Sequence, residues 1–86
     1  MRKELWSDDA WADYLWWKSK DKDIAKKIDE LLDDIQRDPF AGLGSPKPLK
    51  ANWHGHWSRR ITQEHRLVYR VTVESIYIEL CCGHYE

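Results

Sequence analysis

The sequence has few of the residues on which disulfide-bonded and metal-binding proteins depend. Its 86 residues include only two cysteines, the neighbours Cys81 and Cys82. Adjacent cysteines rarely pair with each other, and no Cys/His spacing typical of zinc is present, so we predict reduced thiols, no metal and no cofactor. No apolar run approaches the roughly 20 residues of a membrane helix, and no signal peptide is recognisable. We therefore expect a cytoplasmic protein with no membrane partner.

Glycine and proline are also scarce, with four and three residues respectively. Most of them fall in one segment, residues 40–52 (FAGLGSPKPLKAN), which we predict to be a loop. The rest of the chain is left almost free to form regular helices and strands. Because a chain of this length has no room for a second core, residues 1–86 are expected to form a single domain.

A strong positive charge is missing as well, since the net charge is −1. The charge is unevenly distributed, however: residues 1–39 sum to −3 and residues 40–86 to +2, and all four histidines lie in the second part. This asymmetry suggests that one face of the second part meets an anion.

Apolar periodicity predicts the order β-α-α-β-β-β. A stripe from Ile24 to Ile35 indicates an amphipathic helix that ends before Pro39, and Asp34 is expected on its solvated face. The expected elements are a strand at 2–6, helices at 8–18 and from 21 or 23 to about 38, and strands at 56–62, 66–72 and 75–81. The fold class is therefore α+β: an antiparallel sheet with a helical hairpin packed on one face and the other face open for binding.

The stretch 57–69 (WSRRITQEHRLVY) places four cationic or titratable side chains on two predicted strands: Arg59, Arg60, His65 and Arg66. Cations on rigid strands suit a phosphate backbone, although a merely solvated sheet face fits this stretch equally well. An RNA backbone can be cut without metal by a base at the 2′-OH, cations at the phosphate and an acid at the leaving oxygen. The candidates for these roles are Lys47, Lys50, Arg60, Glu64, His65, Arg66, His84 and Tyr85.

Several motifs resemble YoeB-type toxins of the RelE/YoeB (ParE-like) toxin–antitoxin superfamily. They are LWSDDAWADYLWW, KKIDELLDDIQRDPFAGLGSPKPLK, WSRRITQEHRLVYRV and the final GHY. The resemblance implies a RelE-like fold and a ribosome-dependent mRNA endoribonuclease that needs no metal. It also implies cleavage in the ribosomal A site, neutralisation by a YefM-type antitoxin and a homodimer.

Carried over by position, the resemblance assigns the catalytic arginine to Arg66 and the His-Tyr pair to His84 and Tyr85. It assigns phosphate or RNA binding to Arg60 and Lys50. Arg66 would stabilise the transition state, His84 would pass a proton to the leaving oxygen, and Tyr85 would orient the RNA.

The loop departs from the family pattern at one position. YoeB proteins have a glutamate between the two prolines as a proposed base, whereas this chain has Lys47. The lysine could act as the base, with neighbouring cations favouring the neutral amine. It could instead supply only positive charge and leave the base role to His84, or it could mark a weak enzyme. Glu86 is a second departure, because the family pattern ends at the tyrosine.

Two other functions are compatible with the same sequence. One is a binding module that cuts RNA weakly or not at all and works mainly through its antitoxin. The other is co-repression of the operon, in which operator DNA is contacted only through the antitoxin.

Overall fold

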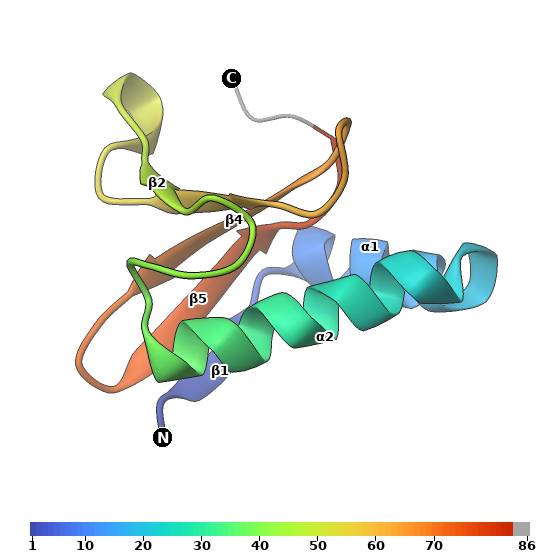
Figure 1. Ribbon diagram of the computed structural model, residues 1–86, viewed down its shortest axis with the longest axis horizontal. Coiled ribbons are helices and arrows are strands. Elements are labelled where there is room, and N and C mark those ends of the chain that lie inside the picture. Colours follow the sequence, from blue (N-terminus) through green and yellow to red (C-terminus); the bar gives the residue numbers. More distant parts are fainter. Residues whose placement is uncertain (84–86) are drawn as a thin grey trace.

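The computed structural model describes residues 1–83 and shows two helices on one side of a five-stranded sheet (Figure 1). The final three residues lie outside the described part. In chain order the elements are β1 (Lys3–Trp6), α1 (Asp8–Lys20), α2 (Lys22–Arg37), β2 (Lys47–Pro48), the 3-10 turn η1 (Ala51–Trp53), β3 (Trp57–Arg60), β4 (Arg66–Val71) and β5 (Ser75–Leu80).

The sheet has the strand order β1-β5-β4-β3-β2. The pairs β3–β4 and β4–β5 are antiparallel, as expected for strands joined by short turns, and the pair β2–β3 is antiparallel as well. The expectation of a wholly antiparallel sheet was wrong for β1, which pairs parallel to β5. The helical hairpin returns the chain to the start of β1, where the Gln36 side chain accepts the Arg2 N–H at 3.0 Å and donates to the Arg2 carbonyl at 2.7 Å. The prediction of a loop at residues 40–52 was also incomplete, because this segment contains the edge strand β2.

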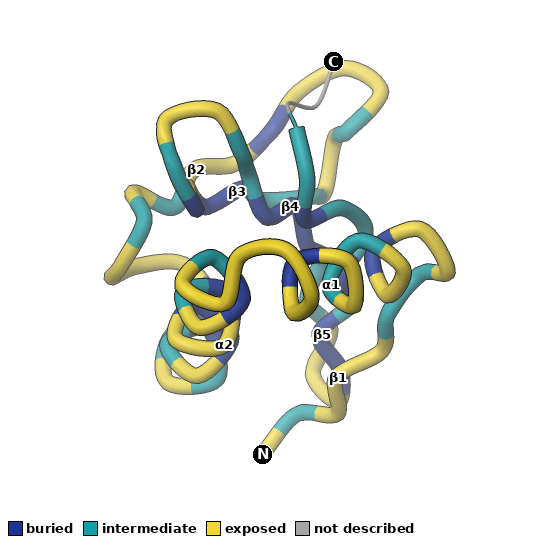
Figure 2. Tube along the Cα trace, turned by 90° about the vertical axis from the view of Figure 1, so that its right-hand side faces the viewer, coloured by how far each residue is buried: buried dark blue, intermediate teal, exposed yellow. Residues whose placement is uncertain are grey.

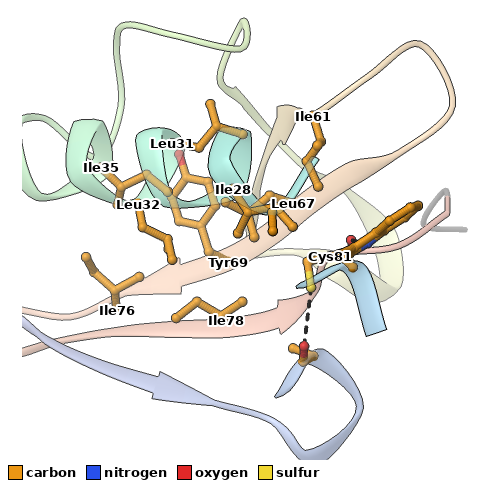
Figure 3. Close-up of a cluster of buried hydrophobic side chains, with 13 residues drawn as sticks. Ile28, Leu31, Leu32, Ile35, Ile61, Leu67, Tyr69, Ile76, Ile78 and Cys81 are labelled. Atoms are coloured by element: carbon orange, nitrogen blue, oxygen red, sulfur yellow. Dashed lines mark hydrogen bonds between the residues drawn. The ribbon is translucent and has the colours of Figure 1, made fainter. Parts of the chain in front are cut away.

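The core lies between the helices and the face of β3, β4 and β5 that they cover (Figure 2). The predicted stripe of α2 is confirmed, since Ile28 and Ile35 are fully buried and Leu31 lies with them. Figure 3 shows these side chains packed against Leu67, Tyr69, Ile76 and Ile78 of the sheet. At the β2 edge of the sheet, η1 lies on the side away from the helices (Figure 1).

Helix α1 begins where the sequence predicts. Ser7 accepts a hydrogen bond from the Ala10 N–H, and Asp8 and Asp9 add negative charge at the positive end of the helix dipole. A single residue, Asp21, ends α1 and caps α2. The turn between the helices is therefore shorter than expected. No helix within the described part is long and apolar enough to span a membrane.

Candidate functional site

Strand alternation divides the cations of β3 between the two faces of the sheet. Trp57, Arg59 and Ile61 point to the helix-covered side, where Arg59 is fully buried. Arg60 points to the other side and is exposed. Successive side chains of a strand face opposite ways, so two consecutive arginines have different environments. Of the two arginines of β3, only Arg60 can meet a ligand on the open face.

Arg60 and Arg66 lie directly opposite each other across β3 and β4. Like charges in that position repel and destabilise the sheet. No carboxylate among residues 1–83 forms an ion pair with either side chain. Among the described residues this pair of positive charges is therefore not neutralised, and it suits an anion that bridges the two side chains.

The guanidinium of Arg66 is anchored on one side. Its Nη1 donates to the carbonyl oxygens of Thr62 at 2.7 Å and of Gln63 and His65 at 3.2 Å each. These three carbonyls belong to the tight turn between β3 and β4, which the Thr62 hydroxyl shapes by accepting the N–H groups of residues 64 and 65. The other two guanidinium nitrogens of Arg66 donate to no described group, so this fork is fixed in place and can still bind phosphate.

The loop before β2 brings Lys47 to the same place. Gly44 is held against β3 because its carbonyl oxygen accepts the Arg60 N–H at 2.7 Å. The φ of Gly44 is +78°. A Cβ at this position would lie 3.0 Å from the Arg60 carbonyl oxygen and 3.0 Å from Leu31 Cδ2, so only glycine fits. Lys47 then pairs with the buried Ser58. Residues lining the resulting hollow of about 80 Å³ are Gly44, Ser45, Lys47, Ser58, Arg60 and Arg66.

Arg59 fixes the loop from beneath. It forms an ion pair with Asp34 of α2, and its Nε donates to the Tyr69 hydroxyl at 3.1 Å. The remaining donors reach three loop carbonyls, those of residues 38, 41 and 43, at 2.7, 3.2 and 3.1 Å. Tyr69 in turn donates to the Pro39 carbonyl at 2.6 Å. The loop therefore has many fixed points before it reaches Lys47.

The expectation that Asp34 belongs to a solvated face was wrong. Its side chain is only 12% exposed and accepts hydrogen bonds from Arg37, the Leu43 N–H and Arg59. These donors, with Arg37 contributing most, hold the pKa of the Asp34 carboxyl well below its usual range. The carboxylate connects α2, the loop and β3.

Three of the predicted site residues converge, namely Lys47, Arg60 and Arg66. Lys50 does not line the hollow: it is exposed and lies at the start of η1. His84 and Tyr85 lie outside the described residues. No cluster of His, Cys, Asp or Glu suited to a metal occurs among residues 1–83.

Sequence reasoning missed the neutral part of the hollow, which is formed by Gly44, Ser45 and Ser58. The alternation of β3 gave a signal for Ser58, since it places that side chain on the same face as Arg60. No comparable signal marked Gly44 or Ser45, because their position depends on how the loop folds back. A larger hollow of about 690 Å³ lies elsewhere, beside Arg2, Gln36 and Glu74. Its charges are mixed, so we assign the site by chemistry and not by size.

Comparison with known proteins gives a consistent result. Residues 6–85 match the family model described as "YoeB-like toxin of bacterial type II toxin-antitoxin system". The chain is 57% identical to Toxin YoeB of Escherichia coli (strain K12) over 83 residues, which cover 96% of this chain and 99% of that protein.

Solved structures agree. A YoeB dimer from Staphylococcus aureus matches with a TM-score of 0.92 at 44% identity, covering 98% of each chain. A YoeB–YefM complex from the same species matches with a TM-score of 0.91 at 42% identity, covering 99% of each. The chain belongs to the YoeB-like toxin family of bacterial type II toxin–antitoxin systems.

Proposed function

We propose that this toxin is a ribosome-dependent mRNA endoribonuclease that cuts mRNA in the ribosomal A site and so inhibits translation. The observation that supports it best is the facing pair Arg60 and Arg66, with Lys47 on the same hollow. Three cations gathered around a small open hollow fit one phosphate group and the charge that develops on it during cleavage. RNA supplies both the phosphate and the neighbouring 2′-OH.

The reaction is a transesterification at phosphorus. The ribose 2′-oxygen attacks the adjacent phosphate, a 2′-oxygen–phosphorus bond forms, and the phosphorus–5′-oxygen bond breaks. The 2′-OH proton goes to a base, and the 5′-oxygen receives a proton from an acid. Arg66 and Arg60 bind the non-bridging oxygens, because each guanidinium presents a planar set of donors.

We assign the proton transfers to Lys47 and His84. His84 donates to the leaving oxygen, since imidazole changes protonation near neutral pH. Lys47 is either the base or a third positive charge. If it supplies only charge, His84 first takes the 2′-OH proton as the base and then donates a proton as the acid. Tyr85 orients the RNA, and Lys50 contacts the strand farther from the cut.

The partners follow from the same proposal. We expect the 70S ribosome and mRNA as the working complex in the cytoplasm, a YefM-type antitoxin as the inhibitor, and a homodimer as the free form. Operator DNA is contacted only through the antitoxin. The proteins of Staphylococcus aureus noted above, one described as a dimer and one as a YoeB–YefM complex, support the two protein partners.

A cleavage assay on purified ribosomes tests the proposal. Ribosomes carry an mRNA with a defined A-site codon, and the 5′ end created by the toxin is mapped by primer extension. Wild type is expected to cut within the A-site codon, and Arg66→Gln and His84→Gln are expected to lower the rate at least 100-fold. Arg70→Gln, which removes a cation of β4 outside the hollow, is the matched control. If wild type leaves the mRNA intact, the proposed endoribonuclease activity is refuted.

One observation favours a second function. Lys47 stands where the family pattern has a glutamate, and a weakly active binding module would act mainly through antitoxin binding and operon co-repression. Lys47→Glu separates the two. A rate that rises by tenfold or more indicates a glutamate-base mechanism that the natural chain has lost. An unchanged or lower rate indicates that the lysine works as it stands.

A further inference from the structure

The chain beyond β5 is attached to elements that are far away in the sequence. β5 ends at Leu80, which is also the last residue of β5 that pairs with β4. Even so, the Trp17 indole N–H donates to the Cys81 carbonyl at 3.0 Å in a buried contact. The Cys81 thiol donates to the Ala10 carbonyl at 3.3 Å, as Figure 3 shows. Two groups of α1 therefore hold the first residue after the strand.

Gly83 is held by both of its backbone polar groups. Its N–H donates to His65 Nδ1 at 2.8 Å, and its carbonyl oxygen accepts the Arg66 N–H at 3.0 Å. Both partners come from the start of β4, and the second is the residue whose guanidinium lines the cationic hollow. The last described residue is thus bound directly to the backbone of the proposed catalytic arginine.

The imidazole of His65 is fixed in turn by Trp17. The two rings meet edge to face with centroids 4.8 Å apart, and the indole is only 6% exposed. One tryptophan therefore orients the histidine and binds the Cys81 carbonyl at the same time. An Nδ1 that accepts a hydrogen bond carries no proton, so His65 is the neutral tautomer with its proton on Nε2.

The backbone conformation of Gly83 is one that favours glycine. Its φ is +73°, a region that side-chain-bearing residues rarely adopt, although a Cβ there would touch nothing within 4 Å. Glycine is therefore present for its conformation and not for lack of space. With both polar groups bound and φ positive, the backbone of Gly83 itself is held in one conformation.

We propose that Trp17 and His65 form a tail clamp, with His65 as a positioning residue for the reaction. The clamp fixes Gly83 beside Arg66, and in this proposal the fixed Gly83 limits how far the proposed acid, the next residue in the chain, can be from the phosphate site. This inference rests on the proposed function. Its physical basis is that misplacing a catalytic group by about 1 Å can cost on the order of 100-fold in rate.

Two substitutions of His65 separate its hydrogen bond from its packing. His65→Phe keeps a ring against Trp17 and removes the acceptor. His65→Asn loses the ring and keeps an oxygen where Nδ1 lies. His54→Phe, at an exposed histidine of the loop after η1, controls for the phenylalanine itself.

The first readout is the maximal cleavage rate at saturating toxin on programmed ribosomes, together with the toxin concentration that gives half of it. His65→Phe is expected to lower the maximal rate at least tenfold and to leave the half-saturating concentration within twofold. His65→Asn is expected to keep more of the rate than His65→Phe. Equal rates for wild type and His65→Phe would overturn the proposal. So would His65→Asn being the slower variant, since packing would then be what matters.

The second readout does not depend on catalysis. The Gly83 amide N–H is expected to exchange with solvent at least tenfold faster in His65→Phe than in wild type, with partial protection in His65→Asn. Equal exchange in all three proteins would overturn the clamp. A wild-type protein that cuts no mRNA would instead refute the proposed function and the positioning role that rests on it, while Gly83 exchange still decides whether the tether exists.

Discussion

Replacing Asp34 with asparagine tests whether the buried ion pair with Arg59 holds the loop. The change keeps the size of the side chain and an oxygen for the Leu43 N–H, which donates to it at 2.8 Å. It removes the carboxylate that pairs with Arg59, whose side chain is fully buried. The remaining partners of Arg59 are neutral oxygens, namely one hydroxyl and three carbonyls.

The expected cost follows from that geometry. Breaking a buried pair by removing one partner costs about 3–5 kcal/mol, because the other charge stays buried without compensation. Asparagine keeps part of the hydrogen bonding, so we expect the lower end, about 3 kcal/mol. The whole free energy of unfolding of a small domain is only about 5–15 kcal/mol. The loss is therefore a large fraction of the stability.

Urea denaturation followed by tryptophan fluorescence measures this loss. With an m value of about 1 kcal/mol per molar urea, the midpoint should fall by about 3 M. Asp33→Asn is the matched control, since Asp33 is the neighbouring exposed carboxylate of α2. It should change the free energy of unfolding by no more than about 0.5 kcal/mol. A loss for Asp34→Asn within 1 kcal/mol of the control, taken as about the error of such comparisons, would refute the reasoning.

The same pair predicts a dependence on pH. The pKa of the Asp34 carboxyl is lowered in the folded protein, mainly by the Arg37 guanidinium, then by the Leu43 N–H and Arg59. Its contribution is therefore fully present above the unfolded value of about 3.9 and is lost as pH falls towards the lower folded value. Below about pH 4 the wild type should lose stability more steeply than Asp34→Asn. Parallel pH profiles would contradict this.

Three further predictions concern the supports of the fold. Tyr69→Phe should cost about 1–3 kcal/mol in the same urea assay, because a buried loop carbonyl and the Arg59 Nε–H lose their partner; an unchanged midpoint would contradict it. Ser7→Ala should cost about 1 kcal/mol, since the Ala10 N–H loses its cap, whereas Ser7→Asp should recover most of that loss. Burial raises the pKa of the Cys81 thiol to about 12, so iodoacetamide at about pH 8 should leave Cys81 unmodified in the native protein and alkylate it in urea, as read by mass spectrometry.

The helices were predictable because their signals are local. The stripe of α2, the Ser7 cap and the stop before Pro39 all act within a few residues, and the structure confirms them. The pairing of β1 with β5 joins Lys3 to Ser75, which are 72 positions apart in the printed sequence. Nothing local to β1 specifies its partner, so the parallel edge could not be read from the chain.

The site divides in the same way. The sequence marked Lys47, Arg60 and Arg66 by residue type and resemblance, and the resemblance separated Arg60 from Arg59. It did not show that Asp34 would be withdrawn from solvent to pair with Arg59. That outcome depends on the loop folding back over α2, and the periodicity of α2 carries no information about the loop.

By itself, the sequence determined the order of the two helices and four of the five strands, the buried face of α2 and the residue types that a phosphate site requires. Only the tertiary structure decided which cations meet, which arginine is buried, and how Gly83 is bound between His65 and Arg66. The physical reason is that periodicity and capping are properties of neighbouring residues, whereas burial, repulsion and hydrogen bonding between distant residues exist only after the chain has packed.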